Sequence, residues 1–487
     1  MTQPSMAPET ALPARPAANK TALIGVAGLL ILLTNAVVFL LPPLLPIIQA
    51  QYELTTVAQT TWIYTALTLG GGAGFVVLPR VADIYGDRNA SVAASALLTL
   101  GALIPAVGDS YPTLVAGCAV IGVGGAAQLL PLGFLRRGLG DGGLTIGVAV
   151  LVIGTGIGIV VGMIGGGLAV ENLSIQAFFI ILTALFALST VWSYLSIPHT
   201  PPAEASGRMG VLGTVWLIGW VAALLLAMTQ GLVWGTAALI PLAVGAIGAI
   251  AWLRVERRSP NAVFDVSVLK SANVLTASGC MALIAAVNSA FLILLSTYAQ
   301  VPPEYLPKTE AYGLGLTALQ TGMRMLPFAA TFLVGSILAD GPVNRGQGGN
   351  VLIAGALIAI AGLVWLALAH DQQWHYLVGS GVVGLGCALN YAAGFTLVQM
   401  AVPEAKAGMA SGIAGMFMAI GFAFGTAVVA SLLSVSVIVI PGTTIEVATA
   451  NLYAPAYWTA AVLAALIPVT VLTARARTKR RAGAALV

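Results

Sequence analysis

The sequence predicts an all-α integral membrane protein in which two bundles of six helices flank two inserted helices, fourteen transmembrane helices in all. Three observations predict this class. Hydrophobic runs of membrane-spanning length recur about fourteen times, and a helix needs about 20 apolar residues to cross the hydrocarbon core. Charged residues make up only 7% of the 487 residues, and the mean hydropathy is +0.98. Lys and Arg lie almost entirely between the runs.

The predicted helices fall into three groups along the chain. The first six cover residues 22–41, 57–78, 91–107, 114–134, 144–170 and 176–197. Two more cover 211–228 and 235–252, and the last six cover 275–298, 322–338, 351–369, 376–400, 409–437 and 458–472. The total falls to twelve or thirteen if a short run such as 458–472 does not cross the membrane.

Polar loops at 199–210 and 254–273 separate these groups and divide the chain into five segments. In order, these are a disordered cytoplasmic tail (1–20), an N-terminal six-helix bundle (21–198), a linker with the two inserted helices (199–272), a C-terminal six-helix bundle (273–474) and a basic cytoplasmic tail (475–487). Two facing bundles around a central cavity are typical of transporters that work by alternating access.

The basic residues predict the orientation in the membrane, because Lys and Arg concentrate on the cytoplasmic side. If the N-terminus is cytoplasmic, all of the 20 basic residues except Lys308 and Arg324 fall in cytoplasmic loops or tails. Both termini are therefore predicted to be cytoplasmic, in a multi-pass protein of the cell membrane. The net charge of +4 reflects this orientation, and no nucleic-acid partner is expected.

The loop between the second and third helices, residues 79–88, reads PRVADIYGDR. An acid at a helix end beside arginines can form a charge-assisted contact between neighbouring helices. Asp83, Gly86 and Arg88 are therefore candidates for a conformational latch, and Asp340 belongs to a weaker copy of the motif at 336–345. The alternative is an ordinary loop whose arginines only mark the cytoplasmic side.

Glycine recurs every four residues in the fifth predicted helix, at Gly154, Gly158, Gly162 and Gly166, and Gly167 follows directly. Four-residue spacing places the first four on one helical face, where the missing side chains allow another backbone to approach closely. Close helix packing and a hinge are both compatible with this pattern.

Several further motifs follow one another in a defined order. They are LPIIQ at 45–49, Trp62 at the start of the second helix, ERRSP at 256–260, PE at 403–404 and GMASG at 408–412. Together they resemble the major facilitator superfamily, and within it the 14-helix drug:proton antiporters, over about residues 45–430. Residues 79–88 resemble its G-x-L-A-D-R-x-G-R-R signature, with Pro79 in place of the first Gly. Residues 162–167 resemble its G-P-x-x-G-G signature, with Met163 in place of Pro.

The resemblance implies a secondary active transporter that exports a small drug or metabolite by alternating access, and a monomer is expected. Members of this type usually keep an acid in the first helix and an Arg in the fourth, but this chain has Val37 and Cys118 at the aligned positions. No Asp or Glu lies in the middle of a predicted helix, although a buried carboxylate is the simplest proton carrier. Protons therefore stay a possible partner, and an uncoupled facilitator or uptake carrier stays an alternative.

Polar side chains within the predicted helices are the candidates for a substrate cavity. They are Asn35, Trp62, Tyr64, Gln128, Asn288, Arg324, Asn390 and Tyr391. A buried amide must find a partner in another helix or in a ligand. Asn35 and Asn288 lie in corresponding helices of the two bundles, which favours the cavity for both. Arg324 could attract an anion or extend to the outer surface. A cavity without fixed acids fits a neutral, amphipathic or anionic solute.

A membrane-embedded enzyme or sensor is the alternative of another class, and the residues argue against it. The three histidines and the acids form no catalytic constellation, and no GxxxxGK[ST] loop for ATP is present. The three cysteines have no metal-binding spacing. No catalytic residue, metal or cofactor is expected.

Overall fold

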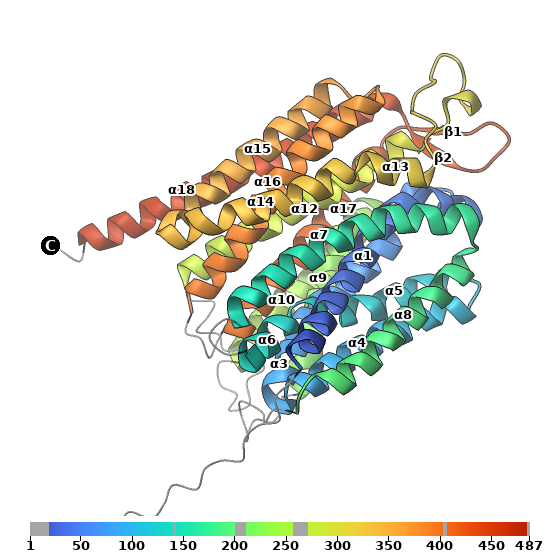
Figure 1. The fold of residues 1–487 in the computed structure, drawn as a ribbon. Coiled ribbons are helices and arrows are strands. Elements are labelled where there is room, and N and C mark those ends of the chain that lie inside the picture. The colour runs from blue at the N-terminus through green and yellow to red at the C-terminus, as the bar shows by residue number, and fades with distance from the viewer. Residues whose placement is uncertain (1–18, 140–142, 200–210, 257–270, 403–406, 485–487) are drawn as a thin grey trace, which may run out of the picture.

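The computed structural model describes residues 19–139, 143–199, 211–256, 271–402 and 407–484 (Figure 1). Several predicted features lie wholly or mostly outside these residues, namely the tail 1–20, the loop 199–210, and the motifs at 256–260 and 403–404. Residues 475–484 of the predicted basic tail belong to the last helix.

Helices account for nearly all of the described chain. Up to residue 199 they are α1 (Lys20–Gln51), α2 (Val57–Thr60), α3 (Trp62–Tyr85), α4 (Asp87–Val107), α5 (Tyr111–Gly124), η1 (Gly125–Gln128), α6 (Leu130–Leu139), α7 (Gly143–Asn172) and α8 (Ile175–Ser196). The middle of the chain forms α9 (Val211–Trp234), η3 (Gly235–Ala238) and α10 (Leu239–Glu256).

The remaining elements form the C-terminal half. They are α12 (Ala272–Ala299), η4 (Pro303–Tyr305), α13 (Ala318–Arg324), α14 (Leu326–Pro342), η5 (Val343–Gln347), α15 (Gly348–Leu368), α16 (Gln373–Met400), α17 (Ala407–Leu433), β1 (Val437–Val439), β2 (Glu446–Ala448), η7 (Ala450–Leu452) and α18 (Tyr453–Ala484).

Twelve helical stretches of the described chain are long and apolar enough to cross a membrane, as predicted for a multi-pass membrane protein. One of these stretches, Ala318–Leu368, contains α13, α14 and α15 together. In α9, a shorter apolar stretch covers Val215–Leu224. Large apolar side chains on the outer faces of the helices are exposed, as expected for surfaces that meet lipid tails.

Two of the predicted transmembrane helices are interrupted within their apolar segments. The fourth predicted helix divides into α5 and α6 at Gly124 and Gly125, and the 3₁₀ turn η1 joins the two pieces. The tenth divides into α13 and α14 at Met325, directly before Leu326 and Pro327. Irregular backbone within a membrane is tolerated where it lines a cavity or is buried in protein. The break at η1 belongs to the first case, because Gly125 and Gln128 line a cavity.

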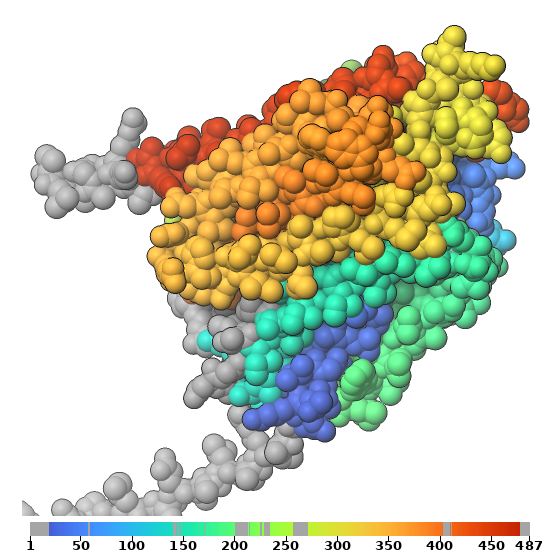
Figure 2. Space-filling view, turned by 45° about the horizontal axis from the view of Figure 1, so that its top comes forward, coloured from blue at the N-terminus to red at the C-terminus, as the bar shows by residue number. Residues whose placement is uncertain are grey.

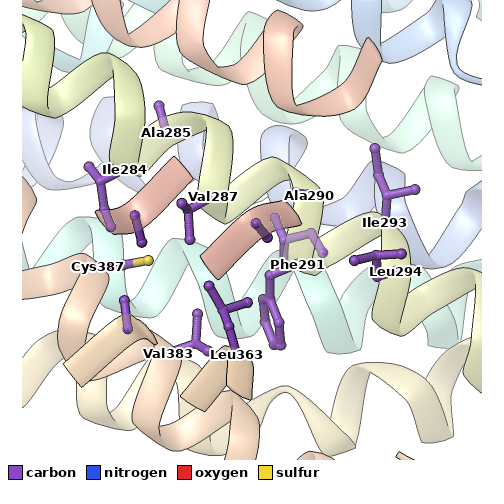
Figure 3. Close-up of a cluster of buried hydrophobic side chains, with 14 of the residues drawn as sticks. Ile284, Ala285, Val287, Ala290, Phe291, Ile293, Leu294, Leu363, Val383 and Cys387 are labelled. Carbon is purple, nitrogen blue, oxygen red and sulfur yellow. The ribbon is translucent and has the colours of Figure 1, made fainter. Parts of the chain in front are cut away.

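Two hydrophobic cores hold the molecule together, one made almost entirely by α1–α8 and the other mainly by the C-terminal half. The second core centres on α12, which is buried on nearly all sides from Ile284 to Leu295. Figure 3 shows side chains of α12 beside Leu363 of α15, and Val383 and Cys387 of α16. A helix that is apolar all round is expected at such a central place.

The two halves meet mainly along two seams, and α1 also contacts α12. At one seam α7 packs against α13 and α14, and Figure 2 shows teal α7 against the yellow and orange helices. At the other seam α3 packs against α17, and α9 lies over both of them. In turn α10 packs on α9, where Trp252 donates from its indole N–H to the Gly213 carbonyl oxygen at 2.9 Å. The inserted pair therefore covers the α3–α17 seam.

A short β-hairpin corrects one predicted helix and adds strands to the predicted all-α fold. The helix expected over 409–437 ends at Leu433, and Val437 lies in β1, which pairs antiparallel with β2. The chain from Val435 to Ile440 is rich in β-branched residues, and Pro441 and Gly442 then turn it back. Hydropathy cannot separate such a strand from the end of a helix, because both are apolar.

Candidate functional site

A cavity of about 830 Å³ lies between the two halves. Its walls come from α1, α3, α5, η1, α6 and α7 on one side and from α12, α14, α16 and α17 on the other. This volume is within the range of pockets that hold small organic ligands. We call the end of the molecule that carries β1 and β2 the hairpin end, and the opposite end, where α3, α6 and α18 finish, the basic end.

The cavity reaches the molecular surface at the basic end. Arg136 at the end of α6 lines it there, together with the exposed residues Asp340 and Asn344. The Asn344 amide donates from Nδ2 to the Asp340 carboxylate at 3.0 Å. These charged groups stand at the mouth of the cavity, far along the helices from its centre.

At the hairpin end the two halves are joined by hydrogen bonds. The Ser296 hydroxyl donates to the Pro42 carbonyl oxygen, and Gln300 Nε2 donates to the Pro43 carbonyl oxygen at 3.0 Å. The hairpin reaches across as well, because the Glu446 N–H donates to the Thr55 carbonyl oxygen at 3.0 Å. None of these residues lines the cavity, so the described chain is closed at this end and open at the other.

On the N-terminal side of the cavity, Asn35 is the centre of a small polar network. Its Nδ2 lies 2.8 Å from the Ile31 carbonyl oxygen, 3.2 Å from Gln128 Oε1 and 3.4 Å from the Thr155 hydroxyl. These side chains come from α1, η1 and α7, so the break at η1 is what brings Gln128 to the cavity wall. Asn35 is buried, while Gln128 and Thr155 are partly exposed to the cavity.

On the C-terminal side, Asn288 of α12 and Tyr391 of α16 line the cavity. Their exposed fractions are 1% and 8%, and the Tyr391 ring lies 5.9 Å from the Phe332 ring. The Asn288 side chain lies close enough to the Tyr391 hydroxyl to interact with it, while the Asn288 carbonyl oxygen Oδ1 has no hydrogen-bond partner among the described residues. Leaving a buried polar atom without a partner costs about 1–3 kcal/mol, so Asn288 Oδ1 is suited to meet a ligand.

Between these polar patches the cavity wall is apolar and rich in aromatic rings. The large apolar lining residues include Val37, Val38, Phe39, Leu67, Phe75, Phe332, Phe395, Met418 and Phe422. Aromatic walls bury large, flat apolar surfaces and leave orientation to a few polar groups.

Four of the eight candidate cavity residues do not line the cavity. Tyr64 is fully buried with its ring 6.4 Å from Phe422, and Trp62 begins α3 at the hairpin end. Asn390 faces α15, because a Cβ at Gly355 would lie only 2.5 Å from its Nδ2. Arg324 hydrogen-bonds with Gln373 outside the cavity.

Near the candidate latch residues of the 79–88 motif lies an ion pair that the sequence reasoning missed. Asp87, 3% exposed, accepts two hydrogen bonds from Arg137, and its Oδ2 lies 2.7 Å from Arg137 Nε. Asp83 is close enough to act electrostatically on the same guanidinium. The pair joins the start of α4 to the end of α6, so it lies within the N-terminal half. The sequence contained a signal for this ion pair, because Asp87 belongs to the 79–88 motif.

The other latch candidates have separate surroundings. Gly86 joins α3 to α4 with φ +87°, a backbone conformation that favours glycine. The Arg88 guanidinium stands 4.2 Å from the centre of the Tyr194 ring on α8. Asp340 is at the cavity mouth, in the half opposite to the other three.

The glycine stripe of α7 faces α1 at every fourth position. A Cβ at Gly162 would lie 2.3 Å from the Ala36 carbonyl oxygen, and one at Gly158 would lie 2.7 Å from the Leu32 carbonyl oxygen. Gly154 and Gly166 also face α1, but a Cβ there would first meet the side chains of Ile31 and Leu40. Gly167 instead meets α13, where a Cβ would lie 2.4 Å from Leu319 Cα. The stripe therefore packs one half internally, and Gly167 packs the two halves together.

Comparison with known proteins identifies the family. The family model described as Major Facilitator Superfamily matches residues 27–206 and 190–426, which is most of the chain. The chain belongs to the Major Facilitator Superfamily. It is a membrane transporter rather than an enzyme, and members of this family carry small molecules across membranes.

Curated relatives of this major facilitator transporter carry names of drug and antibiotic resistance. The multidrug resistance protein Stp of Mycobacterium tuberculosis (strain CDC 1551 / Oshkosh) is 27% identical over 383 residues, which cover 77% of this chain and 68% of Stp. The lincomycin resistance protein of Streptomyces lincolnensis is 26% identical over 398 residues, which cover 80% of this chain and 79% of that protein.

Solved structures show the same fold at low sequence identity. A bacterial homologue of the human drug peptide transporters PepT1 and PepT2 superposes with a TM-score of 0.64 at 14% identity, over 95% of this chain and 99% of that one. The human organic anion transporter MFSD10 (TETRAN) gives 0.60 at 14% identity, over 93% and 99%.

Proposed function

We propose that this transporter exports a small organic molecule from the cytoplasm across the cell membrane by alternating access. The observation that carries the proposal is the cavity of about 830 Å³ between the halves, which is closed at the hairpin end and open at the basic end. A substrate could enter from the basic end in this state and leave after the hairpin end opens. The resistance names of the relatives support outward transport.

The orientation and span number are part of the proposal. Arg80, Arg136, Arg345 and Arg475 all lie at the basic end, which supports a cytoplasmic position for this end and for both termini. We propose fourteen spans, with α9 and α10 as an inserted pair between six-helix bundles at 21–198 and 273–474. Two observations support raising the twelve apolar stretches to fourteen spans. The 24 residues of α9 are long enough for a span, and the 51 residues of Ala318–Leu368 turn back at Gly346, with φ +78°, as two spans would. We propose a monomer as the working unit.

The second candidate function is an uncoupled facilitator. The scarcity of acidic side chains in the cavity favours this alternative. Asp340 is the one acid among the described lining residues, and it stands at the exposed mouth. Proton-coupled export would need a carboxylate that changes its protonation during the cycle. Here Asp83, Asp87 and Asp340 at the basic end are the candidates.

The experiment that tests the proposal is transport in proteoliposomes with neutral, anionic and cationic compounds, each with and without an imposed pH gradient. Accumulation against the solute gradient that depends on the pH gradient would establish proton-coupled export. Movement that only follows the solute gradient would establish a facilitator. A chain that moves none of the compounds under either condition contradicts the proposed function.

A further inference from the structure

We propose that the cavity selects an uncharged, planar ring compound that carries a hydrogen-bond acceptor at one edge and a hydroxyl or N–H group at the other. This inference rests on the proposed function and deepens it, because it names the class of substrate and the atoms that hold it. It follows from three properties of the cavity, which are a donor on one wall, an amide oxygen without a partner beside a buried hydroxyl on the opposite wall, and aromatic surfaces between them.

The donor is the side-chain amide of Gln128. Its Oε1 already accepts a hydrogen bond from Asn35 Nδ2 at 3.2 Å. Asn35 is held in turn by the Ile31 carbonyl oxygen at 2.8 Å, so the network sets the direction of the Gln128 amide. The Nε2 group of Gln128 is then left to donate into the cavity that this residue lines. It suits a carbonyl or ether oxygen of a ligand.

The opposite wall offers an acceptor and a hydroxyl. Asn288 and Tyr391 are more than nine-tenths buried and line the cavity, and their side chains interact with each other. Asn288 Oδ1 finds no hydrogen-bond partner among the described residues. An amide oxygen only accepts, so Asn288 calls for a ligand O–H or N–H. A hydroxyl can donate or accept, so Tyr391 accommodates either. Gln128 belongs to the N-terminal half and Asn288 to the C-terminal half. A ligand that hydrogen-bonds with both residues is therefore bound by the two bundles together.

The remaining walls determine the shape and charge of the ligand. Phe39, Phe75, Phe332, Phe395 and Phe422 surround the cavity, and flat rings pack on such surfaces by stacked or edge contacts. The charged side chains among the described lining residues, Arg136 and Asp340, stand at the basic end. A cation held between Gln128 and Asn288 would therefore lack a counter-charge in a desolvated site.

Binding of fluorescent anthraquinones to the purified full chain tests this inference. Daunomycinone is uncharged and carries carbonyl and hydroxyl groups on its rings, whereas daunorubicin adds a cationic amino sugar. N-trifluoroacetyl-daunorubicin keeps the sugar without the charge and controls for size. We expect daunomycinone and the acylated compound to bind, and daunorubicin to bind about tenfold more weakly. Daunorubicin binding equally or more tightly, or daunomycinone failing to bind, would overturn the inference.

Matched variants test which atoms hold the ligand. Tyr391→Phe removes only the hydroxyl that lines the cavity, and Tyr64→Phe removes a hydroxyl that is fully buried outside the cavity lining. We expect Y391F to weaken daunomycinone binding about tenfold and Y64F to leave it unchanged. Asn288→Leu and Gln128→Met should weaken it similarly. Equal binding by Y391F and the unmodified chain contradicts the assignment.

Failure of this inference and failure of the proposed function give different results. Transport of other solutes with no daunomycinone binding would overturn the substrate class and leave the transporter proposal standing. Tight daunomycinone binding that responds to Y391F, with no transport of any solute, would uphold the binding site and contradict export.

Discussion

Gln49 near the end of α1 donates from its side-chain Nε2 to the backbone carbonyl oxygen of Glu446 in β2 at 3.2 Å, across 397 residues of sequence. In the same place the Glu446 N–H donates to the Thr55 carbonyl oxygen at 3.0 Å. The hairpin between α17 and α18 therefore extends from the C-terminal half and binds the first loop of the N-terminal half. Opening of the hairpin end, which alternating access requires, must break these bonds.

A disulfide between Thr55→Cys and Glu446→Cys is predicted to stop transport. The backbone N···O distance of 3.0 Å between the two residues limits the separation of their Cα atoms to about 7 Å, the upper limit for a disulfide. Oxidation would then hold the hairpin end closed, and reduction would restore transport. The measurement is the initial transport rate in proteoliposomes before and after reductant. The two single variants are the controls, and an oxidised double variant that transports at the full rate refutes the role of the hairpin.

Each predicted helix overlaps a helix of the structure, because a run of apolar residues is a local property of the sequence that does not depend on how the helices are arranged. The glycine stripe of α7 could also be predicted from a local property, because the four-residue period alone places Gly158 and Gly162 on one face of the helix. The β-hairpin could not be predicted from the sequence. Its residues are as apolar as those of α17, and the bond from Gln49 that holds it depends on a contact distant in sequence.

The cavity was predicted only in part, and two adjacent residues show why. Asn390 and Tyr391 were equally good candidates, yet Tyr391 lines the cavity and Asn390 faces Gly355 of α15. Neighbouring positions on a helix point about 100° apart, so the rotation of α16 decides which residue meets a ligand. An all-round apolar helix leaves that rotation open, because no polar face marks one side.

Gly162→Ala is predicted to destabilise the protein, whereas Gly165→Ala on the same helix is predicted to be neutral. A Cβ at Gly162 would lie 2.3 Å from the Ala36 carbonyl oxygen, so α1 and α7 must move apart. At Gly165 the nearest such contact is Val161 Cγ1 at 4.0 Å. Overpacking of this kind costs about 1–3 kcal/mol. Thermal unfolding of the purified variants measures the difference, and equal midpoints for the two would show that α1 can shift freely.

Asp87→Asn is predicted to loosen the join between α4 and α6. The carboxylate is 3% exposed and accepts both hydrogen bonds of a bidentate pair from Arg137. Arg137 is 47% exposed and keeps contact with water, so the expected loss is moderate, about 2 kcal/mol. Asp340→Asn is the matched control, because Asp340 is exposed and its amide replacement can still bond with Asn344. Unfolding midpoints should fall for D87N alone, and an equal fall in both would assign the effect to net charge.

The pH dependence of stability is predicted to depend on His370 in the loop between α15 and α16. Burial lowers the pKa of His370 from its ordinary value of 6.5, although its Nδ1 lies 2.9 Å from the Leu366 carbonyl oxygen and Asp371 favours the charged form. The rings of Tyr298 and Tyr457 pack against it at 5.0 and 5.9 Å, and His375 also lowers its pKa. The folded protein therefore binds this proton less readily than the unfolded chain.

The contribution of neutral His370 to the free energy of unfolding is fully present above pH 6.5. It is lost as the pH falls from 6.5 through the lowered pKa that His370 has in the folded state. Unfolding midpoints at about pH 8 and about pH 5 measure the loss. His370→Phe keeps an aromatic ring between Tyr298 and Tyr457 but cannot titrate, so its midpoint should fall less between the two pH values. His199→Gln, which changes an exposed histidine, should fall as much as the unmodified chain. If H370F and H199Q lose the same amount, the acid sensitivity belongs to other groups.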